Sequence, residues 1–230
     1  MAMEVIAKAM KKKQATLSEH DSKNLLKEYG VPVTKEYLVK SAKEAVEKAK
    51  AVGFPVVLKG CAAALAHKTE SDAVRLNLLD AKAVRLAFKE IKANAGLKLD
   101  GVLVQEMVKG QRELVIGLIR DPQFGPCVMF GLGGIYTEIL RDVSFRVAPL
   151  EKRDALEMMD EIKGKKILEA FRGMAPADRE TLAKALLALG EIGLKHPEVK
   201  EIDVNPLILK KTGEPVAVDA LVVLDNPKAK

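Results

Sequence analysis

Residues 126–142 read PCVMFGLGGIYTEILRD, an apolar run followed by closely spaced glycines and then by polar and acidic residues. The run Pro126 to Phe130 has the composition of a strand. Gly131, Gly133 and Gly134 permit the positive φ values with which a nest of backbone N–H groups surrounds phosphate oxygens. The stretch lacks the Gly-Lys-Ser/Thr of a Walker loop, and a plain tight turn explains the glycines equally well. It therefore indicates either a phosphate-binding loop or a tight turn.

The chain before this stretch alternates between helical and strand-like patterns. Ser18 and Gly30 bracket a helix over 21–29, and Ser41 and Gly53 bracket another, as capping residues and terminal glycines commonly do. Short apolar runs between the helices predict strands. The predicted strands cover 33–39, 56–60, 74–78 and 101–107, and a third helix covers 81–94.

The chain after residue 107 predicts a second set of elements. Strand-like runs cover 113–119, 126–130, 202–209 and 217–223, and helical patterns cover 153–162, 165–171 and 177–194. Two lobes joined by a hinge near 107–110 account for these patterns better than one doubly wound sheet. We therefore predict an α/β fold of the α+β type. Its parts are an N-terminal extension over 1–17, a small lobe over 18–106, a large lobe over 107–225 and a tail over 226–230.

The composition is that of an ordinary globular protein. Of the 230 residues 48% are apolar and 30% are charged, which is enough for a buried core. The net charge of +6 would suit nucleic acid, but the lysines are interleaved with glutamates, apart from those at 11–13, and the chain has no tryptophan. We expect a solvated, charged surface that suits small polyanions, and no nucleic-acid partner.

The two cysteines and the absence of long apolar runs bear on location. Cys61 and Cys127 are too few and too far apart for a disulfide framework or a CxxC metal site, so both are interpreted as reduced core thiols. No apolar run approaches the about 20 residues of a membrane span, and the N-terminus lacks the apolar segment of a signal peptide. The expected location is the cytoplasm, with no membrane contact.

Oxygen ligands are grouped near the C-terminal end. Asp203 and Asn205 lie two residues apart in a strand-like run, so both point to one face while their apolar neighbours point into the core. Asp219 lies in an apolar strand, where its burial without a cation or hydrogen bonds would be costly. Mg²⁺ prefers such oxygen ligands. The alternative is a polar strand end capped by an Asx turn before Pro206.

Two further residues suggest contacts with a nucleotide. Lys59 follows the buried run Val56 to Leu58, where a lysine is more plausible as a phosphate ligand than as core filler, although a snorkelling lysine is the alternative. Glu106 ends a strand at the predicted hinge. The backbone of Glu106 to Val108 can hydrogen-bond an adenine edge, and the alternative is an edge-strand carboxylate in water.

His67 lies in a polar segment and is not expected in the core. A neutral imidazole is nucleophilic near pH 7, so a histidine beside a phosphate-binding lysine can accept a phosphoryl group on a ring nitrogen. The alternative is an ordinary surface histidine. His20 and His196 have no such neighbours, and no role is assigned to them.

Several segments together resemble one known family. They are VVLKG at 56–60, HKT at 67–69, QEMV at 105–108, REL at 112–114, the stretch 121–150 and EIDVNPL at 201–207. From residue 18 to residue 224 the chain is similar to the β subunit of the ADP-forming acetyl-CoA synthetases, which have the ATP-grasp fold with nucleotide bound between two lobes. This family belongs to the nucleoside diphosphate-forming acyl-CoA synthetases, which include succinyl-CoA synthetase.

The resemblance implies an enzyme, an acid–thiol ligase. Its reversible reaction converts acyl-CoA, ADP and phosphate to carboxylic acid, CoA and ATP through phosphohistidine, with Mg²⁺ as cofactor and ATP or ADP as substrate. A separate CoA-binding α subunit would complete the enzyme, as an α2β2 hetero-oligomer. Acetate is the acid that the resemblance implies.

The resemblance also assigns roles to individual residues. The implied nucleotide-binding residues are Lys59, Gly60, Glu106, Met107, Val108, Glu113, Gly131, Gly133 and Gly134. The implied Mg²⁺ ligands are Asn205 and Asp219. The implied catalytic residues are His67, which relays the phosphoryl group between distant sites, and Asp203, which steadies a phosphohistidine near the nucleotide.

One departure from the family concerns the segment after His67. Many members read His-Lys-Thr/Ser-Asp-Val-Gly-Gly-Val, whereas this chain has Glu70, Ser71, Asp72 and Ala73 before Val74. Without both glycines the loop cannot take the same positive-φ turn without strain. The histidine is kept, and phosphorylation is still expected. Two alternatives are a stand-alone ATP-grasp ligase, which would not need His67, and a non-catalytic nucleotide sensor, which would not need the metal ligands.

Overall fold

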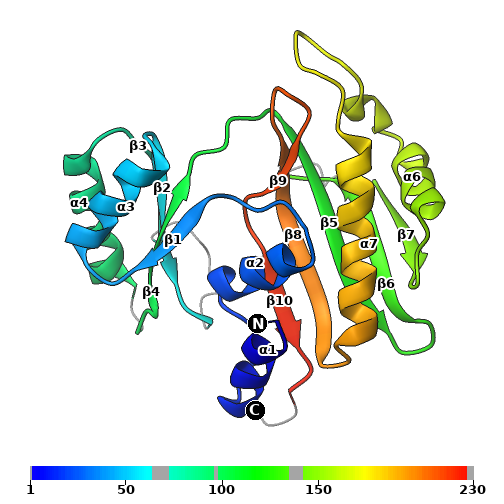
Figure 1. Cartoon of the computed structure of the whole chain (residues 1–230), viewed down its shortest axis with the longest axis horizontal. Coiled ribbons are helices and arrows are strands. Elements are labelled where there is room, and N and C mark those ends of the chain that lie inside the picture. Colours follow the sequence, from blue (N-terminus) through cyan, green and yellow to red (C-terminus); the bar gives the residue numbers. More distant parts are fainter. Residues whose placement is uncertain (1, 64–72, 96–97, 135–141, 227–230) are drawn as a thin grey trace. The chain divides into compact units, whose positions relative to one another are not determined.

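The structure is a computed structural model that describes residues 2–63, 73–95, 98–134 and 142–226 (Figure 1). The chain divides into two compact units. The larger unit contains Met1–Leu17, Asp21–Val33 and Val108–Lys230, and the smaller unit contains Ser18–His20 and Thr34–Met107. The chain thus passes between the units at the predicted hinge, whereas residues 1–17 and most of the first predicted helix belong to the larger unit rather than to an extension or a small lobe.

The smaller unit is a four-stranded antiparallel sheet with two helices. The strand order is β1-β4-β2-β3, so β4 lies between β1 and β2, which run parallel to each other. The helices follow β1 and β3 in the chain and share a core with the sheet. The elements are β1 (Glu36–Val39), α3 (Ala42–Val52), β2 (Val56–Cys61), β3 (Val74–Leu78), α4 (Ala81–Asn94) and β4 (Gly101–Glu106).

The helices begin and end where capping chemistry predicts. The Ser41 hydroxyl accepts a hydrogen bond from the Glu44 N–H at 3.2 Å, and the Asp80 carboxylate accepts one from Ala83 at 2.7 Å. Gly53 ends α3 with φ +95°, a value that disfavours any residue with a Cβ. The predicted helices over 41–53 and 81–94 are confirmed.

The two faces of the small sheet differ. Val56 and Leu58 pack into the core with α3 and α4, so Val57 and Lys59, which alternate with them along β2, belong to the opposite face. On the neighbouring strand β4, Val102 and Val104 share the same core. Strand alternation therefore places Lys59 on the sheet face that the helices do not cover.

The larger unit contains a six-stranded antiparallel sheet. Its order is β10-β8-β5-β6-β7, and β9 pairs with β8 at the other end of that long strand (Figure 1). The strands are β5 (Arg112–Asp121), β6 (Gly125–Leu132), β7 (Val143–Val147), β8 (Val199–Leu209), β9 (Pro215–Ala217) and β10 (Leu221–Leu224). The helices are α1 (Ala2–Lys11), α2 (Glu19–Glu28), α6 (Lys152–Glu161) and α7 (Arg179–Lys195), with a short 3₁₀ turn, η3 (Lys165–Leu168).

Helix α7 packs on β5 and β6, and glycine sets how close it comes. A Cβ on Gly193 would lie 2.6 Å from Leu118 Cδ1 and 2.7 Å from Pro126 Cβ, so only glycine fits without movement. A Cβ on Gly190 would meet its nearest atom, Leu150 Cδ1, at 3.1 Å. Close packing of this kind is characteristic of protein cores.

The N-terminal residues are part of this core. Helix α1 was not predicted from the sequence, yet Ile6 and Ala9 are buried in the same cluster as the large sheet. Helix α2 contributes Leu25 and Leu26, and the Ser22 hydroxyl accepts a hydrogen bond from the Val222 N–H at 3.2 Å. The helix predicted over 21–29 is confirmed, and it begins two residues earlier.

Two other predictions fail for local reasons. The helix predicted over 165–171 is only the single turn η3, because Arg172 and Gly173 take positive φ values and reverse the chain. The strand predicted over 217–223 is divided into β9 and β10 by residues 218–220. Strand β7 was not predicted, and it pairs with β6 from Gly131↔Val143 to Cys127↔Val147.

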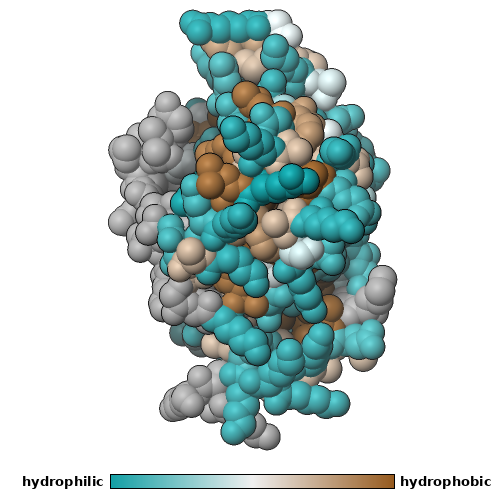
Figure 2. Space-filling view, turned by 90° about the vertical axis from the view of Figure 1, so that its left-hand side faces the viewer, coloured by the Kyte–Doolittle hydropathy of each residue, from teal (hydrophilic) through white to brown (hydrophobic). Residues whose placement is uncertain are grey.

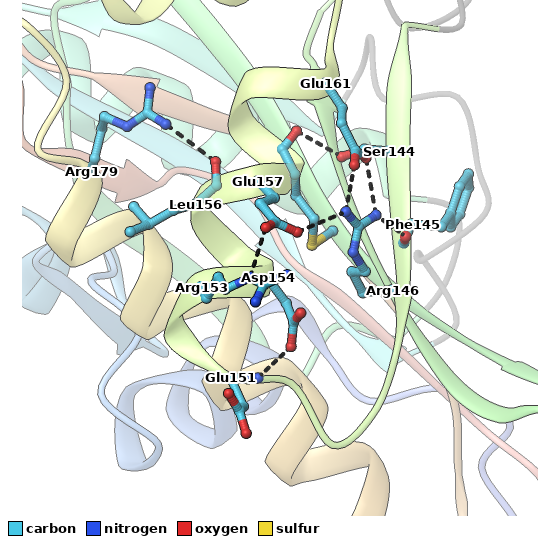
Figure 3. A network of polar contacts seen from close by, with 11 residues as sticks. Ser144, Phe145, Arg146, Glu151, Arg153, Asp154, Leu156, Glu157, Glu161 and Arg179 are labelled. Carbon is cyan, nitrogen blue, oxygen red and sulfur yellow. Dashed lines mark hydrogen bonds and ion pairs between the residues drawn. The ribbon is translucent and has the colours of Figure 1, made fainter.

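Strand β7 is held to α6 by a polar network (Figure 3). The Ser144 hydroxyl donates to the Met158 carbonyl at 2.9 Å, and the Arg146 guanidinium binds the Glu161 carboxylate with two nitrogens. The guanidinium lowers the pKa of the Glu161 carboxyl below its ordinary value. These contacts fix the strand that borders the glycine-rich end of β6.

The surface agrees with the composition. The face drawn in Figure 2 is mainly hydrophilic, with small apolar areas between charged and polar residues. Within the described ranges, no helix is both long and apolar enough to cross a bilayer.

Gly193→Ala is expected to destabilise the larger unit by about 1–3 kcal/mol, because the new methyl group overlaps Leu118 and Pro126. Urea unfolding followed by circular dichroism measures the change. Gly190→Ala is the matched control in the same helix, where the better helix propensity of alanine should offset the milder contact. Equal losses for both variants would contradict this account of the packing.

Candidate functional site

The predicted oxygen ligands come together on one face of the large sheet. Ile202 and Val204 are buried in the core, and Asp203 and Asn205, which alternate with them along β8, are half-buried on the opposite face. Asp203 lies opposite Gly117 on β5 and opposite Leu221 on β10. The predicted alternation along β8 is confirmed.

Asp219 lies opposite Asn205, although not in a continuous strand. The pairs Leu207↔Ala217 and Asp203↔Leu221 keep one register across the break between β9 and β10, and this register brings Asp219 to the level of Asn205. The Val218 N–H donates to the Pro206 carbonyl at 3.0 Å. Asp219 accepts a hydrogen bond from the Ala220 N–H at 2.8 Å. The predicted strand is therefore interrupted at Asp219, which is half-buried at the strand break, where its carboxylate is within reach of backbone donors and solvent.

The glycine-rich end of β6 is folded against the strands beside it. The Gly133 N–H donates to the Glu113 carbonyl at 2.9 Å, and the Gly134 N–H donates to Asn205 Oδ1 at 3.3 Å. Gly131 lies within β6, paired with Val115 and Val143. The contacts of Gly131, Gly133 and Gly134 with phosphate stay a prediction, and two of their N–H groups are bonded within the protein. One of them orients Asn205.

Close packing explains why these positions are glycine. A Cβ on Gly133 would lie 2.5 Å from the Leu114 carbonyl oxygen, and a Cβ on Gly131 would lie 2.6 Å from that of Asp142. Gly134 has φ +61°, and a Cβ there would lie 2.1 Å from Glu113 Oε2. The absence of side chains therefore lets the end of β6, the carboxylate of Glu113 and the amide of Asn205 occupy one small region.

Asp142 joins the start of β7 to the end of β6 and to the residues that follow α6. Its side chain accepts hydrogen bonds from the N–H groups of Lys163 and Gly164 at 2.8 and 2.7 Å, and its carbonyl accepts one from Leu132 at 3.2 Å. This buried carboxylate was not among the predicted site residues. Asp142 directly precedes β7, and because this strand was not predicted, the sequence provided no reason to assign Asp142 a structural role.

The environment of Asp203 disfavours its charge. Burial is the main reason that the pKa of Asp203 is raised to about 6, with smaller contributions from the negative charges of Glu201 and Asp219. A carboxylate in such surroundings gains from a nearby cation or a hydrogen-bond donor. The site thus has the electrostatic character expected of a binding site for positively charged or proton-donating groups.

Lys59 is buried on the face of the small sheet opposite α3 and α4. It is 7% exposed, and its ammonium donates to Glu19 Oε1 at 2.7 Å. Glu19 begins helix α2 and was not predicted to belong to the site. Gly60 faces the other way: its N–H donates to Ala73 at 2.8 Å, and a Cβ there would meet Ile91 of α4 at 3.3 Å. Gly60 therefore contributes to packing between sheet and helix.

Glu106 belongs to the last strand of the smaller unit, and Met107 and Val108 lie at the boundary between the two units. Glu106 exchanges two hydrogen bonds with Lys35: its N–H donates to the Lys35 carbonyl at 3.0 Å, and its carboxylate accepts from the Lys35 N–H at 2.7 Å. The amide of Glu106 is thus already bonded. Met107 ends the smaller unit and Val108 begins the stretch that returns to the larger one.

Two of the three histidines, His20 and His196, are hydrogen-bonded to other side chains. His67 lies outside the described residues. His20 Nδ1 lies 3.0 Å from Glu36 Oε1, and His196 Nε2 lies 2.8 Å from the Tyr29 hydroxyl. Burial lowers the pKa of His196 below its ordinary value, as expected of a structural histidine.

The donor set on the large sheet suits a hard divalent cation. Asn205 offers an amide oxygen already oriented by Gly134, and Asp219 offers a carboxylate at the same level of the sheet. Among the residues that the structure describes, no three His, Cys, Asp or Glu side chains form a group that could hold a metal alone. A cation held here would need further oxygen ligands from phosphate or water.

Both cysteines are buried and free, as predicted. Cys61 packs near the start of α2, where its thiol is hydrogen-bonded to the Ser18 side chain and the His20 backbone. Burial is the main reason that the pKa of Cys61 is raised to about 11, so the thiol stays protonated at neutral pH.

Gly134→Ala should destabilise the protein by about 1–2 kcal/mol in urea unfolding, because alanine is strained at φ +61°, whereas the Glu113 carboxylate is the end of a flexible side chain and can move away from the new methyl group. Gly125→Ala is the control: Gly125 has φ +78° with nothing within 4 Å of a Cβ, so the same backbone strain of about 1–2 kcal/mol is expected. In a Glu113→Ala background the cost at Gly134 should stay the same. A cost at Gly134 that falls strongly when Glu113 is removed would refute this account.

Comparisons with known proteins agree with these features. Residues 8–224 match the family described as ATP-grasp domain. The β subunit of acetate–CoA ligase [ADP-forming] I from Pyrococcus furiosus is 44% identical over 228 residues, which cover 97% of each chain.

Solved structures show the same likeness. A dinucleotide forming acetyl-coenzyme A synthetase 1 from Ca. Korarchaeum cryptofilum, in complex with coenzyme A and Ca-AMPCP, is 43% identical with a TM-score of 0.91, and the match covers 97% of this chain and 100% of that one. The same synthetase with coenzyme A and Mg-AMPPCP, whose phosphohistidine segment points towards the nucleotide binding site, is 43% identical with a TM-score of 0.86 over the same shares. The predicted family and fold are thereby confirmed: the chain belongs to the ATP-grasp β subunits of the ADP-forming acetate–CoA ligases, which are acid–thiol ligases.

Proposed function

We propose that this chain is the nucleotide-binding subunit of an ADP-forming acyl-CoA synthetase, which reversibly converts acyl-CoA, ADP and phosphate to carboxylic acid, CoA and ATP. The observation that carries the proposal is the grouping of Asp203, Asn205 and Asp219 on the open face of the large sheet, in a chain 44% identical to such a β subunit. Acetate is the acid that this likeness favours. The reaction would take place in the cytoplasm.

The nucleotide would be bound mainly through its phosphates and its adenine edge. Lys59 would neutralise phosphate charge, because it is a buried cation on the face of the small sheet opposite α3 and α4. The carbonyl of Glu106 and the backbone of Met107 and Val108 would contact the adenine edge. Glu113 would contact the nucleotide beside the glycines at the end of β6.

Asn205 and Asp219 would hold Mg²⁺, and the fit rests on their chemistry. Both offer oxygen atoms at the same level of the sheet, and the Gly134 N–H holds the Asn205 amide with its oxygen turned toward the glycines. Mg²⁺ bound there would neutralise charge on the phosphate oxygens during phosphoryl transfer. The protein would fix the ligands before the nucleotide arrives, which reduces the cost of ordering them on binding.

His67 would be the residue that is phosphorylated. A ring nitrogen of the neutral imidazole would attack the γ-phosphorus of ATP in line, the bond from that phosphorus to the β–γ bridging oxygen would break, and ADP would leave. In the reverse direction ADP would take the same phosphoryl group from phosphohistidine. Asp203 would accept a hydrogen bond from the other ring nitrogen and hold the imidazole in the required tautomer.

A CoA-binding α subunit would supply the remainder of the enzyme, in an α2β2 assembly. Acyl transfer to CoA needs a second site, which the α subunit would provide. The phosphoryl group would then have to travel between the two sites, which requires motion of the carrier segment.

Asn205→Ala and Asp219→Asn are each expected to weaken Mg²⁺-dependent ADP binding by about 10- to 100-fold, because each removes or weakens one of the two protein ligands. Isothermal titration calorimetry with ADP, with and without Mg²⁺, measures the change. Glu214→Gln, an exposed carboxylate in the turn before β9, is the control and should bind as wild type does. If both site variants bind ADP with wild-type affinity, Asn205 and Asp219 do not hold Mg²⁺.

The central experiment follows label from γ-³²P-ATP in the presence of Mg²⁺. Wild-type chain should acquire acid-labile, base-stable label, and His67→Asn should acquire none, each tested with and without a candidate CoA-binding subunit. His20→Asn is the control histidine and should be labelled normally. If the assembled complex makes acyl-CoA while the wild-type chain never takes label, His67 is not the relay. Acyl phosphate formed by this chain without a partner would instead indicate a stand-alone ligase.

A further inference from the structure

The pairing of Lys59 with Glu19 bears on how strongly the protein binds nucleotide. Lys59 Nζ donates to Glu19 Oε1 at 2.7 Å, and the two side chains are 8% and 16% exposed. Glu19 is the first residue of α2, far from Lys59 in the sequence, so nothing in the local pattern around Lys59 indicates this contact. The ammonium that is proposed to bind phosphate is therefore already held by a carboxylate.

The carboxylate is kept in place by the contacts of its neighbours. The Ser18 side chain and the His20 backbone are hydrogen-bonded to the Cys61 thiol, two residues beyond Lys59 on β2. His20 Nδ1 lies 3.0 Å from Glu36 Oε1 on β1. Residues 18–20 belong to the smaller unit with Lys59, whereas the rest of α2 belongs to the larger unit. The residues on both sides of Glu19 are thus anchored to β1 and β2, which keeps Glu19 beside the lysine.

A buried ammonium without an anionic partner is costly, so an enzyme with a buried phosphate-binding lysine needs a counter-ion when phosphate is absent. Glu19 has the charge and the distance for this role. When phosphate oxygens approach, they compete with the Glu19 carboxylate for the same three ammonium donors. The free energy of the existing pair is then subtracted from the free energy of nucleotide binding.

We propose that Glu19 is the counter-ion of Lys59 in the nucleotide-free protein and that phosphates compete with it, so that Glu19 limits nucleotide affinity and eases nucleotide release. This proposal rests on the proposed function of Lys59 as a phosphate ligand. Glu19 is a residue that acts through Lys59 and not a catalytic residue. A synthetase that works reversibly benefits from such a device, because product nucleotide must leave at each turnover.

The test is a double-mutant cycle on ADP affinity, measured by isothermal titration calorimetry of the full chain with Mg²⁺. Glu19→Gln should tighten ADP binding by about 3- to 30-fold, because the neutral amide releases the ammonium. Lys59→Met should weaken ADP binding. In the Lys59→Met background, Glu19→Gln should have clearly less effect, since the ammonium for which it competes is absent.

Each alternative gives a different result. If Glu19→Gln weakens ADP binding, Glu19 positions Lys59 rather than competing for it, and the proposal is overturned. Equal tightening with and without Lys59 would mean simple repulsion between Glu19 and the phosphates, which also overturns it. Glu90→Gln removes a carboxylate of the same unit, which is paired with Arg75 and takes no part in holding Glu19, and it should change ADP affinity by less than about 2-fold.

A second variant keeps the test decisive if Glu19→Gln does not fold. Glu19→Asp retains the charge but shortens the side chain by one methylene, so it breaks the 2.7 Å contact while preserving any repulsion. It should still tighten ADP binding, and wild-type affinity would overturn the proposal. Failure of the proposed function looks different: wild-type chain would not bind ADP, or Lys59→Met would bind it as wild type does.

Discussion

Strand β8 lies with one face in the core and the other open, and the candidate site depends on this constraint. Ile202 and Val204 are buried under the large sheet's helices, and this burial fixes which way Asp203 and Asn205 point. A shift of one residue in register would bury two polar groups and expose two apolar ones, so the register is strongly determined. The chemistry of the open face is therefore specified by the packing of the opposite one.

The glycines at the end of β6 allow this arrangement because they have no side chain. They let backbone approach backbone at positions where a Cβ would lie within 3 Å of its neighbours, and one of them donates a hydrogen bond to Asn205. A glycine-rich stretch is readily interpreted as a phosphate nest, and the same residues here hold a side chain and a strand in place. Binding of phosphate and close packing draw on the same property, the absence of a side chain.

The two units differ in whether the buried charge of the candidate site, Lys59 or Asp203, has a partner of opposite charge among the described residues. In the smaller unit, the buried cation Lys59 is neutralised by Glu19. In the larger unit, burial and nearby carboxylates raise the pKa of Asp203, and no cation among the described residues contributes to this shift. One unit thus holds a compensated cation, and the other holds anionic and amide oxygens suited to a metal ion.

The sequence by itself determined most helices and strands, the alternation along β8 and the family, because caps, glycine stops and short-range periodicity are local properties. It did not predict helix α1 or strand β7, whose places depend on contacts with the large sheet. Only the tertiary structure decided that Asp219 lies at a strand break opposite Asn205, that Gly60 faces α4, and that Glu19 meets Lys59. These are relations between segments far apart in the chain, and no local pattern carries information about which of many distant residues will be brought into contact.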